Sequence, residues 1–151
     1  MTRFADGVWP VMLTPYTEDL AVDADGLAAL TSWYIDKGAA GLFALCQSSE
    51  IFLLSMAERL EVLRHVQIAA AGRVPVIASG HVSYTLSEQV DELQAVAELE
   101  PDALVLISNR LGAPDATDAQ VVRALEALLD RLPADLPLGV YECPFPFKRL
   151  L

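Results

Sequence analysis

The chain has 151 residues, enough for one domain with a hydrophobic core and too few for two ordinary domains. It carries 21 acidic and 10 basic residues, a net charge of −11, so the phosphates of nucleic acids and anionic membranes would be repelled. The N-terminus lacks the apolar segment of a signal peptide, and no apolar run is long enough to span a membrane. We therefore expect a cytoplasmic protein without nucleic-acid or membrane partners.

Five short apolar runs follow one another along the chain and predict β-strands. They begin at residues 8, 41, 74, 103 and 138 and read VWPVML, GLFALC, VPVIASG, ALVLIS and LGVYEC. Their residues are almost continuously apolar instead of alternating with polar ones. This pattern is typical of strands that are buried on both faces of a parallel sheet covered by helices.

Four helices are predicted between these runs, each from a start signal. Asp23 precedes the first helical pattern, and Gly38 and Gly72 stand where the first two helices should end. The other three helices begin with capping boxes, in which Ser or Thr stands three residues before Glu or Gln. These boxes are Ser55 with Glu58, Thr85 with Glu88, and Thr117 with Gln120.

The repeat predicts a single α/β domain over residues 1–151, with about five parallel strands and four helices. Two architectures share this pattern, a doubly wound sheet and a (β/α)₈ barrel of about 250 residues. Too few residues follow Tyr141 for a helix that covers the fifth strand, and no GxGxxG follows the first strand. We therefore expect the N-terminal portion of a TIM barrel, with a five-stranded doubly wound small-molecule-binding domain as the alternative.

Polar residues gather where the predicted strands end, which is where parallel α/β proteins hold their chemistry. Gln47, Ser48 and Ser49 follow the second run, and their polar groups with nearby backbone N–H groups are suited to a small carboxylate. The alternative is a polar turn ahead of the Ser55 cap. The other strand ends read TPY at 14–16, SGH at 79–81, SNR at 108–110 and YECP at 141–144.

Histidine, asparagine, arginine and cysteine side chains are further candidates for binding a ligand or a metal. His81 is expected to be a solvated loop histidine, although its position at a strand end would allow contact with a substrate. Asn109 and Arg110 could meet an anionic substrate tail, but an arginine in a loop is more simply solvated. Cys46 and Cys143 are far apart without CxxC spacing, so the sequence predicts a reducing compartment and no metal site.

Several stretches resemble the dihydrodipicolinate synthase / N-acetylneuraminate lyase family. VWPVMLTPY resembles its first strand and loop, QSSE followed by LSMAER resembles its GTTGE and LSxxER signature, GRVPVIAS its third strand and GVYECPFP its Y-N-x-P motif. The resemblance runs in order over nearly the whole chain. It implies part of a barrel that is often tetrameric, hence a homo-oligomer. It also implies a class I lyase or aldolase, in which a lysine forms a Schiff base with pyruvate or another 2-oxo acid and no cofactor is needed.

The resemblance also implies roles for individual residues. Tyr141 would shuttle protons at the bound carbonyl, because a phenol can donate and accept; the alternative is a strand-end aromatic packed under a loop. Gln47 and Ser48 occupy the positions of two family threonines, and only Ser48 keeps a hydroxyl for the substrate carboxylate. Residues 107–111 (ISNRL) lack the tyrosine of the synthase branch. We therefore do not expect dihydrodipicolinate synthesis.

The Schiff-base lysine of the family lies on a sixth strand, one unit beyond Tyr141. The only lysines here are Lys37, expected at a helix C-terminus, and Lys148, in a loop without the desolvation that activates an amine. We expect that this chain alone forms no Schiff base. The alternative is a truncated product without catalytic activity.

Overall fold

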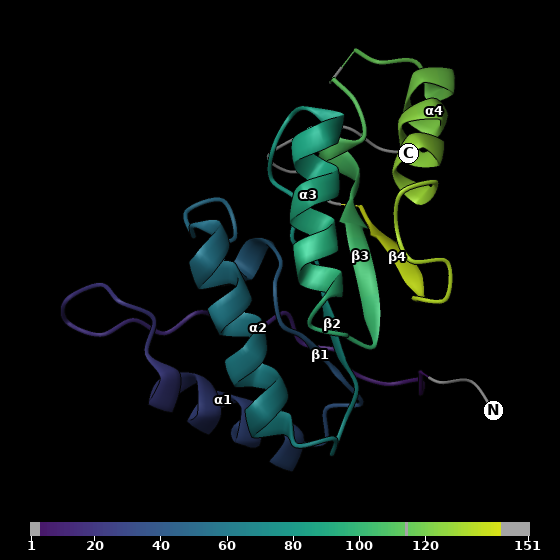
Figure 1. The fold of residues 1–151 in the computed structure, drawn as a ribbon. Helices are drawn as coiled ribbons and strands as arrows, with labels where there is room; N and C mark the ends of the chain where they lie inside the picture. Colours follow the sequence, from purple (N-terminus) through teal and green to yellow (C-terminus); the bar gives the residue numbers. More distant parts are fainter. Residues whose placement is uncertain (1–3, 114, 143–151) are drawn as a thin grey trace.

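The computed structural model describes residues 4–113 and 115–142, in which strands alternate with helices along the chain (Figure 1). The helices are α1 (Ala24–Asp36), α2 (Met56–Ala70), α3 (Leu86–Ala97) and α4 (Asp118–Leu129). The strands are β1 (Leu42–Phe43), β2 (Val76–Ala78), β3 (Ala103–Ile107) and β4 (Leu138–Tyr141). Two short 3₁₀ helices, η1 (Gln47–Ser49) and η2 (Ser108–Arg110), follow β1 and β3. This order confirms the predicted α/β class.

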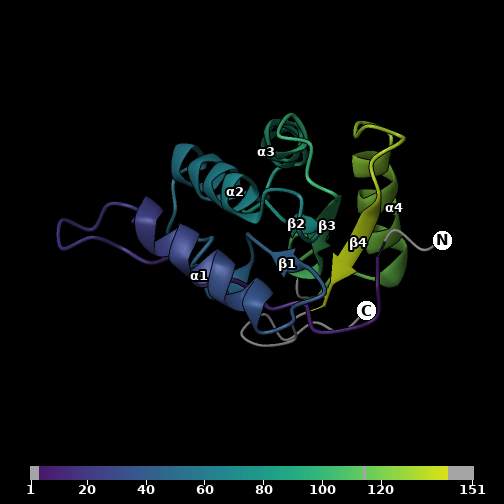
Figure 2. The ribbon, with the colours of Figure 1, turned by 90° about the horizontal axis from the view of Figure 1, so that it is seen from below.

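The four strands are parallel and lie in the sheet in the order of the sequence, β1-β2-β3-β4. A doubly wound sheet would instead place its first strand in the interior, with later strands on both sides. Figure 2 shows α1 to α4 following one another in an arc outside the strands. The sequential order and the arc of helices are those of a barrel segment, so the doubly wound alternative is excluded.

The first apolar run differs from the prediction. Residues 8–13 are extended and lie beside β1, but they form only one parallel bridge, between Val11 and Phe43. The Phe43 N–H donates to the Pro10 carbonyl at 3.0 Å, and the Met12 N–H donates to the Phe43 carbonyl at 2.9 Å. Because Pro10 has no N–H, the pairing cannot be continuous. The segment nevertheless takes the position expected of a first barrel strand.

Successive residues of the strands contribute to two separate apolar clusters, one on each face of the sheet. The larger cluster lies between the sheet and the helices. It contains Leu42, Val76, Ala78, Leu104 and Leu106, together with apolar residues of all four helices. The smaller cluster lies on the opposite face and contains Phe43, Val105 and Cys46, with Val11, Ile77 and Tyr141 packed against it. Tyr141 is therefore on the face directed away from the helices.

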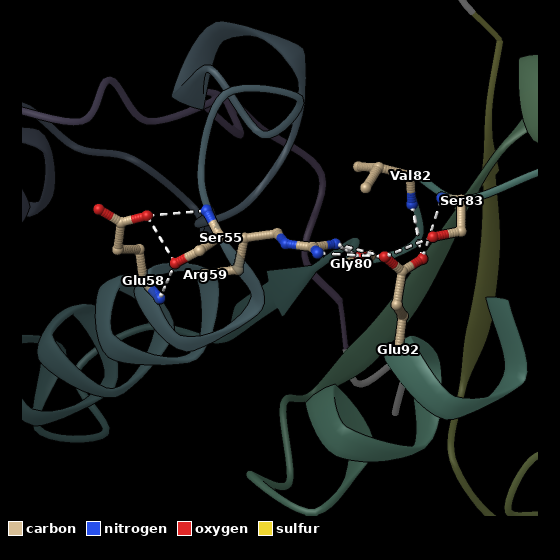
Figure 3. Close-up of polar contacts among 7 residues, drawn as sticks. All are labelled: Ser55, Glu58, Arg59, Gly80, Val82, Ser83 and Glu92. Carbon is tan, nitrogen blue, oxygen red and sulfur yellow. Dashed lines mark hydrogen bonds and ion pairs between the residues drawn. The ribbon is translucent and has the colours of Figure 1, made fainter. Parts of the chain in front are cut away.

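The helix starts agree with the local signals in the sequence. The Asp23 carboxylate accepts the Gly26 N–H at 3.0 Å at the start of α1. At the start of α2 the Glu58 carboxylate accepts the Ser55 N–H at 2.7 Å, and the Ser55 hydroxyl accepts the Glu58 N–H at 3.3 Å (Figure 3). Such caps stabilise a helix by about 1 kcal/mol, because they satisfy N–H groups that have no partner inside the helix.

The other two predicted capping boxes form to different degrees. The Thr117 N–H donates to the Gln120 side chain at 2.7 Å, which completes the box of α4. At α3 the Thr85 hydroxyl accepts the Glu88 N–H at 3.3 Å and contacts the Glu88 carboxylate at 2.6 Å. Both predicted terminal glycines, at positions 38 and 72, have a positive φ, +89° and +70°, the conformation that favours glycine just past a helix.

Candidate active site

The residues after β1 turn sharply because one buried serine holds the bend. The Ser49 hydroxyl can donate its one hydrogen to either of two carbonyls, that of Met12 at 2.7 Å or that of Ala44 at 3.0 Å, and it accepts the Cys46 N–H at 3.2 Å. The Thr14 hydroxyl donates to the Ser49 carbonyl at 2.8 Å. These contacts join the end of the first extended segment to η1. A polar residue at position 49 therefore has a structural role, because its hydrogen bonds hold the turn.

Gln47 and Ser48 occupy the exposed side of this turn. Ser48 is exposed and Gln47 is half-buried, whereas Ser49 is fully buried. The chain then reverses at Glu50, which has a left-handed backbone with φ 58°. The turn thus presents the side chains of Gln47 and Ser48 at the carboxyl edge of the sheet, while the Ser49 hydroxyl is occupied by backbone partners. Substrate contact by Ser49 stays a prediction, and positioning of η1 is the role that its hydrogen bonds support.

Tyr141 stands at the carboxyl end of β4, level with the end of β3, because it pairs with Ile107. Its ring meets the ring of Phe43 edge-on, with centroids 5.9 Å apart and planes at 83°. Tyr141 is half-buried on the face away from the helices. Tyr141 and the η1 turn therefore lie at the same, carboxyl, edge of the sheet. This arrangement is compatible with the predicted shared site, which remains a prediction for Tyr141, Gln47 and Ser48.

His81 is not the solvated loop residue that was expected. Its side chain is fully buried, and its Nε2 accepts the Ile107 N–H at 2.7 Å. Nδ1 lies 2.9 Å from the Gln89 Oε1, so Nδ1 carries the proton of a neutral imidazole. Burial lowers the pKa of His81 to about 4, although Gln89 favours the charged form. His81 therefore connects the end of β2 to the end of β3 and to α3 as a structural residue.

A buried ion pair fixes the loop that carries His81 (Figure 3). The Arg59 guanidinium on α2 lies 3.1 Å from the Glu92 carboxylate on α3 and also donates to the Gly80 carbonyl. Glu92 in turn accepts the N–H groups of Val82 at 2.8 Å and Ser83 at 3.1 Å. We call this cluster the Arg59–Glu92 clasp. It ties two helices and the loop after β2 into one unit.

The electrostatics of the clasp favour the charged carboxylate. Burial raises the pKa of Glu92, but the backbone N–H groups of Ser83 and Val82 and the Arg59 charge outweigh burial. The pKa of Glu92 therefore lies below its ordinary value. Sequence reasoning missed this pair, although Arg59 belongs to the LSMAER stretch, because its partner lies 33 residues away.

Tyr16 and Glu50 connect the first two strand-end loops. Burial raises the pKa of Tyr16, and the hydrogen bond to Glu50 and the charge of Glu50 act in the same direction. The phenol therefore keeps its proton over the whole physiological range. The carboxylate at the end of the η1 turn is thus held by a side chain from the preceding loop.

Arg110 also differs from the expectation of a solvated side chain. Its guanidinium carbon lies over the ring of Tyr84 at 4.1 Å and over the ring of Phe52 at 5.1 Å. These distances are typical of cation–π contacts. The three residues come from the loops after β1, β2 and β3, so three successive loops meet at Arg110. The neighbouring Asn109 is the middle residue of η2.

The lysine within the described residues offers no alternative site, and Cys46 is buried among the apolar side chains of the smaller cluster. Lys37 is the exposed C-cap of α1, which agrees with its predicted position, and Lys148 and Cys143 lie outside the described residues. Among residues 4–113 and 115–142, no three His, Cys, Asp or Glu side chains are grouped as metal ligands would be. No helix of the described part of the chain combines the length and apolar character needed to cross a membrane.

Comparison with solved structures agrees with the barrel-segment fold. YagE of E. coli K12, a protein of the dihydrodipicolinic acid synthase family solved in complex with pyruvate, superposes with a TM-score of 0.79 at 28% identity. The overlap covers 91% of this chain and 45% of YagE. N-acetylneuraminate lyase from Mycoplasma synoviae gives a TM-score of 0.77 at 25% identity, over 95% of this chain and 48% of the lyase.

Sequence comparison leads to the same group of proteins. The 4-hydroxy-tetrahydrodipicolinate synthase of Jannaschia sp. (strain CCS1) is 30% identical over 138 residues, 91% of this chain and 45% of the synthase. The chain thus spans about half the length of the curated relatives it matches. The model of the dihydrodipicolinate synthetase family matches residues 4–113, which include the η1 turn, the clasp and His81. This chain therefore belongs to the dihydrodipicolinate synthetase family.

Proposed function

We propose that this chain provides the N-terminal part of a class I lyase or aldolase that binds pyruvate or another 2-oxo acid. In this proposal Ser48 and the η1 turn bind the carboxylate, Gln47 lies beside them, and the Tyr141 hydroxyl exchanges protons at the carbonyl. The observation that carries the proposal is the placement of these groups. The Ser49 hydrogen bonds present Gln47 and Ser48 at the same edge of the sheet where Tyr141 ends β4.

The chemistry of these groups suits a 2-oxo acid. A hydroxyl and an amide can donate hydrogen bonds to a carboxylate, and a phenol can donate to and accept from the neighbouring carbonyl oxygen. The Phe43 ring contacts the Tyr141 ring edge-on. Pyruvate in the YagE complex makes this substrate class a reasonable choice for a member of the same family.

The side chains present argue against dihydrodipicolinate synthesis as the specific reaction. Gln47 stands where the family has a threonine, and an amide cannot pass a proton as a hydroxyl does. Residues 107–111 contain no tyrosine. We therefore propose a different lyase or aldolase reaction of the same Schiff-base class, carried out by a homo-oligomer in the cytoplasm.

The Schiff-base lysine must come from residues other than the two lysines of this sequence. Lys37 is exposed at the end of α1, outside any partly desolvated pocket of the kind that a Schiff-base lysine needs. By the family resemblance the lysine would follow a sixth strand, next to β4. This chain alone should therefore bind no pyruvate covalently.

Borohydride trapping with pyruvate, read by intact mass, tests the proposal. The 151-residue chain is compared with a chimera in which it is joined to the part of the Jannaschia synthase that it does not cover. We expect no adduct on the chain alone and one adduct on the chimera. A folded chimera without an adduct would contradict the proposal, and an adduct on the chain alone would show that an amine of this sequence is activated.

The role of Tyr141 is tested in the same chimera. Tyr141→Phe should slow trapping at least tenfold, because general acid–base catalysis typically contributes a factor of about 100 to 10,000. Tyr34→Phe on α1 is the matched control, since it also removes one phenol hydroxyl, and it should trap at the unaltered rate. Equal trapping by both variants would remove Tyr141 from the site and leave it as a packing residue.

A further inference from the structure

The environment of Arg110 suggests a ligand site on the other face of the sheet from the proposed active site. Arg110 follows β3, and its carbonyl accepts the Gln89 Nε2 at 3.1 Å. Gln89 is buried and holds His81 with its other end, so the backbone at Arg110 is fixed by a packed core group. The guanidinium carbon lies 4.1 Å from the centre of the Tyr84 ring and 5.1 Å from that of Phe52. The N–H groups of a guanidinium point outward in its own plane, where they can donate to a further partner.

Arg110 has no anionic partner within the part of the chain that the structure describes. Its Nε is buried and has no hydrogen-bond partner there. By contrast, Arg59 and Arg73 are within 4.0 Å of the carboxylates of Glu92 and Asp36. A buried N–H without a partner costs free energy, and the terminal N–H groups of the same guanidinium remain able to bind an anion.

A pocket of about 200 Å³ adjoins Arg110 between the amino end of α3 and α4. Its lining includes Leu86 from α3, Ala124 and Leu128 from α4, and Leu111, Tyr84 and Arg110. The lining is therefore mostly aliphatic, with Arg110 as its positively charged side chain. Pockets of this kind select ligands that combine an apolar body with one polar group.

We propose that this pocket binds a short aliphatic carboxylate, with the two terminal Nη groups of Arg110 donating to the two carboxylate oxygens. A carboxylate matches the guanidinium edge in a bidentate arrangement, and the aliphatic tail would displace water from the leucine walls. A phosphate would also meet the guanidinium but would leave the apolar walls unused. The pocket is lined from the loops after β2 and β3 and from α3 and α4, without Gln47, Ser48 or Tyr141, and it does not depend on the proposed reaction.

Titration with hexanoate, followed by NMR of the ¹⁵N-labelled protein, tests this site. We expect saturable shifts of the Arg110 Nε–H signal and of the Gly112 and Ala124 amide signals. Hexan-1-ol should bind at least tenfold more weakly, because it lacks the charge. Absence of saturable shifts with hexanoate, or equally tight binding of inorganic phosphate, would overturn the proposal.

Three variants separate the pocket from general charge effects. Arg110→Gln should weaken hexanoate binding by about tenfold to a hundredfold, the range for a charge-assisted hydrogen bond. Arg64→Gln on the exposed side of α2 removes the same charge and should leave hexanoate binding unchanged. Ala124→Phe keeps Arg110 but fills the pocket, so it should also abolish binding. Equal weakening by Arg64→Gln, or full binding by Ala124→Phe, would contradict the assignment.

Discussion

The ring of Phe43 on β1 packs edge-on against the ring of Tyr141 on β4, with their centroids 5.9 Å apart. Two strands, β2 and β3, lie between them in the sheet. In a flat sheet three strand spacings would separate these backbones by about 14 Å. The rings can meet only because the sheet curves and the side chains on its concave face converge. The contact is therefore direct evidence of barrel curvature.

Phe43 should contribute much more to stability than an exposed residue of similar character. Phe43→Ala removes a nearly buried ring and its contact with Tyr141, so the free energy of unfolding should fall by about 3 kcal/mol. Leu53→Ala is the control, because Leu53 is 79% exposed, and it should change stability by less than about 0.5 kcal/mol. Urea unfolding measures both variants. Similar losses in the two would mean that the Phe43 ring does not pack as described.

The neighbouring serines of η1 should differ in their effect on stability. Ser49→Ala takes the hydroxyl from two buried carbonyls and the Cys46 N–H, which should cost about 1–3 kcal/mol. Ser48→Ala removes an exposed hydroxyl and should stay within about 0.5 kcal/mol of the parent. Thermal unfolding distinguishes them. A larger loss for Ser48→Ala would show that the turn is held differently.

The Arg59–Glu92 clasp should be sensitive to loss of the carboxylate. Glu92→Ala leaves the Arg59 guanidinium buried with only the Gly80 carbonyl, so stability should fall by about 3 kcal/mol. Glu98→Ala removes an exposed carboxylate at the end of the same helix and serves as the control. Hydrogen exchange adds a local readout, because the Val82 and Ser83 amides should lose protection only in Glu92→Ala. Retained protection of these two amides would argue against the clasp.

The same carboxylate should contribute to acid sensitivity. The pKa of Glu92 is lower in the folded protein than in the unfolded chain, where it is about 4.3. The folded state therefore binds the proton less readily than the unfolded chain. The stability that Glu92 contributes is present above pH 4.3 and is lost as pH falls through the folded pKa. Glu92→Gln should flatten this part of the stability–pH curve, whereas Glu98→Gln should reproduce the parent curve. Parallel curves for Glu92→Gln and the parent would contradict the direction of the shift.

His81 should reduce stability at mildly acidic pH. The native protein holds it neutral with a pKa of about 4, whereas an unfolded histidine takes a proton near pH 6.5. Stability should therefore be unaffected by His81 above pH 6.5 and fall between pH 6.5 and 4, by up to about 3 kcal/mol in total. Urea unfolding at several pH values measures this loss. His81→Gln should flatten the dependence, and the half-buried His65→Gln on α2 should preserve it.

NMR titration of the His81 ring gives an independent check of this pH effect. The ring signals should stay those of a neutral imidazole down to about pH 5, while the Ile107 amide remains hydrogen-bonded. Titration of His81 near pH 6.5 would show that its ring is hydrated instead of buried.

The sequence by itself determined the elements that depend on near neighbours. The three capping boxes join residues three positions apart, so Ser55 with Glu58 can be recognised without knowing the fold. The continuous apolar runs indicated a buried parallel sheet, and their order along the chain became the order in the sheet. The position of Tyr141 at a strand end followed from the same repeat.

Only the tertiary structure decided which contacts form between one strand–helix unit and the next. His81 bonds to Ile107, 26 residues away, and Arg59 pairs with Glu92, 33 residues away, so both look like surface residues in the sequence. Their burial arises when successive strand–helix units stack side by side and close the loops over polar groups, which must then find partners. The sheet curvature that brings Phe43 to Tyr141 likewise arises from the twist of several paired strands, a property that no single segment contains.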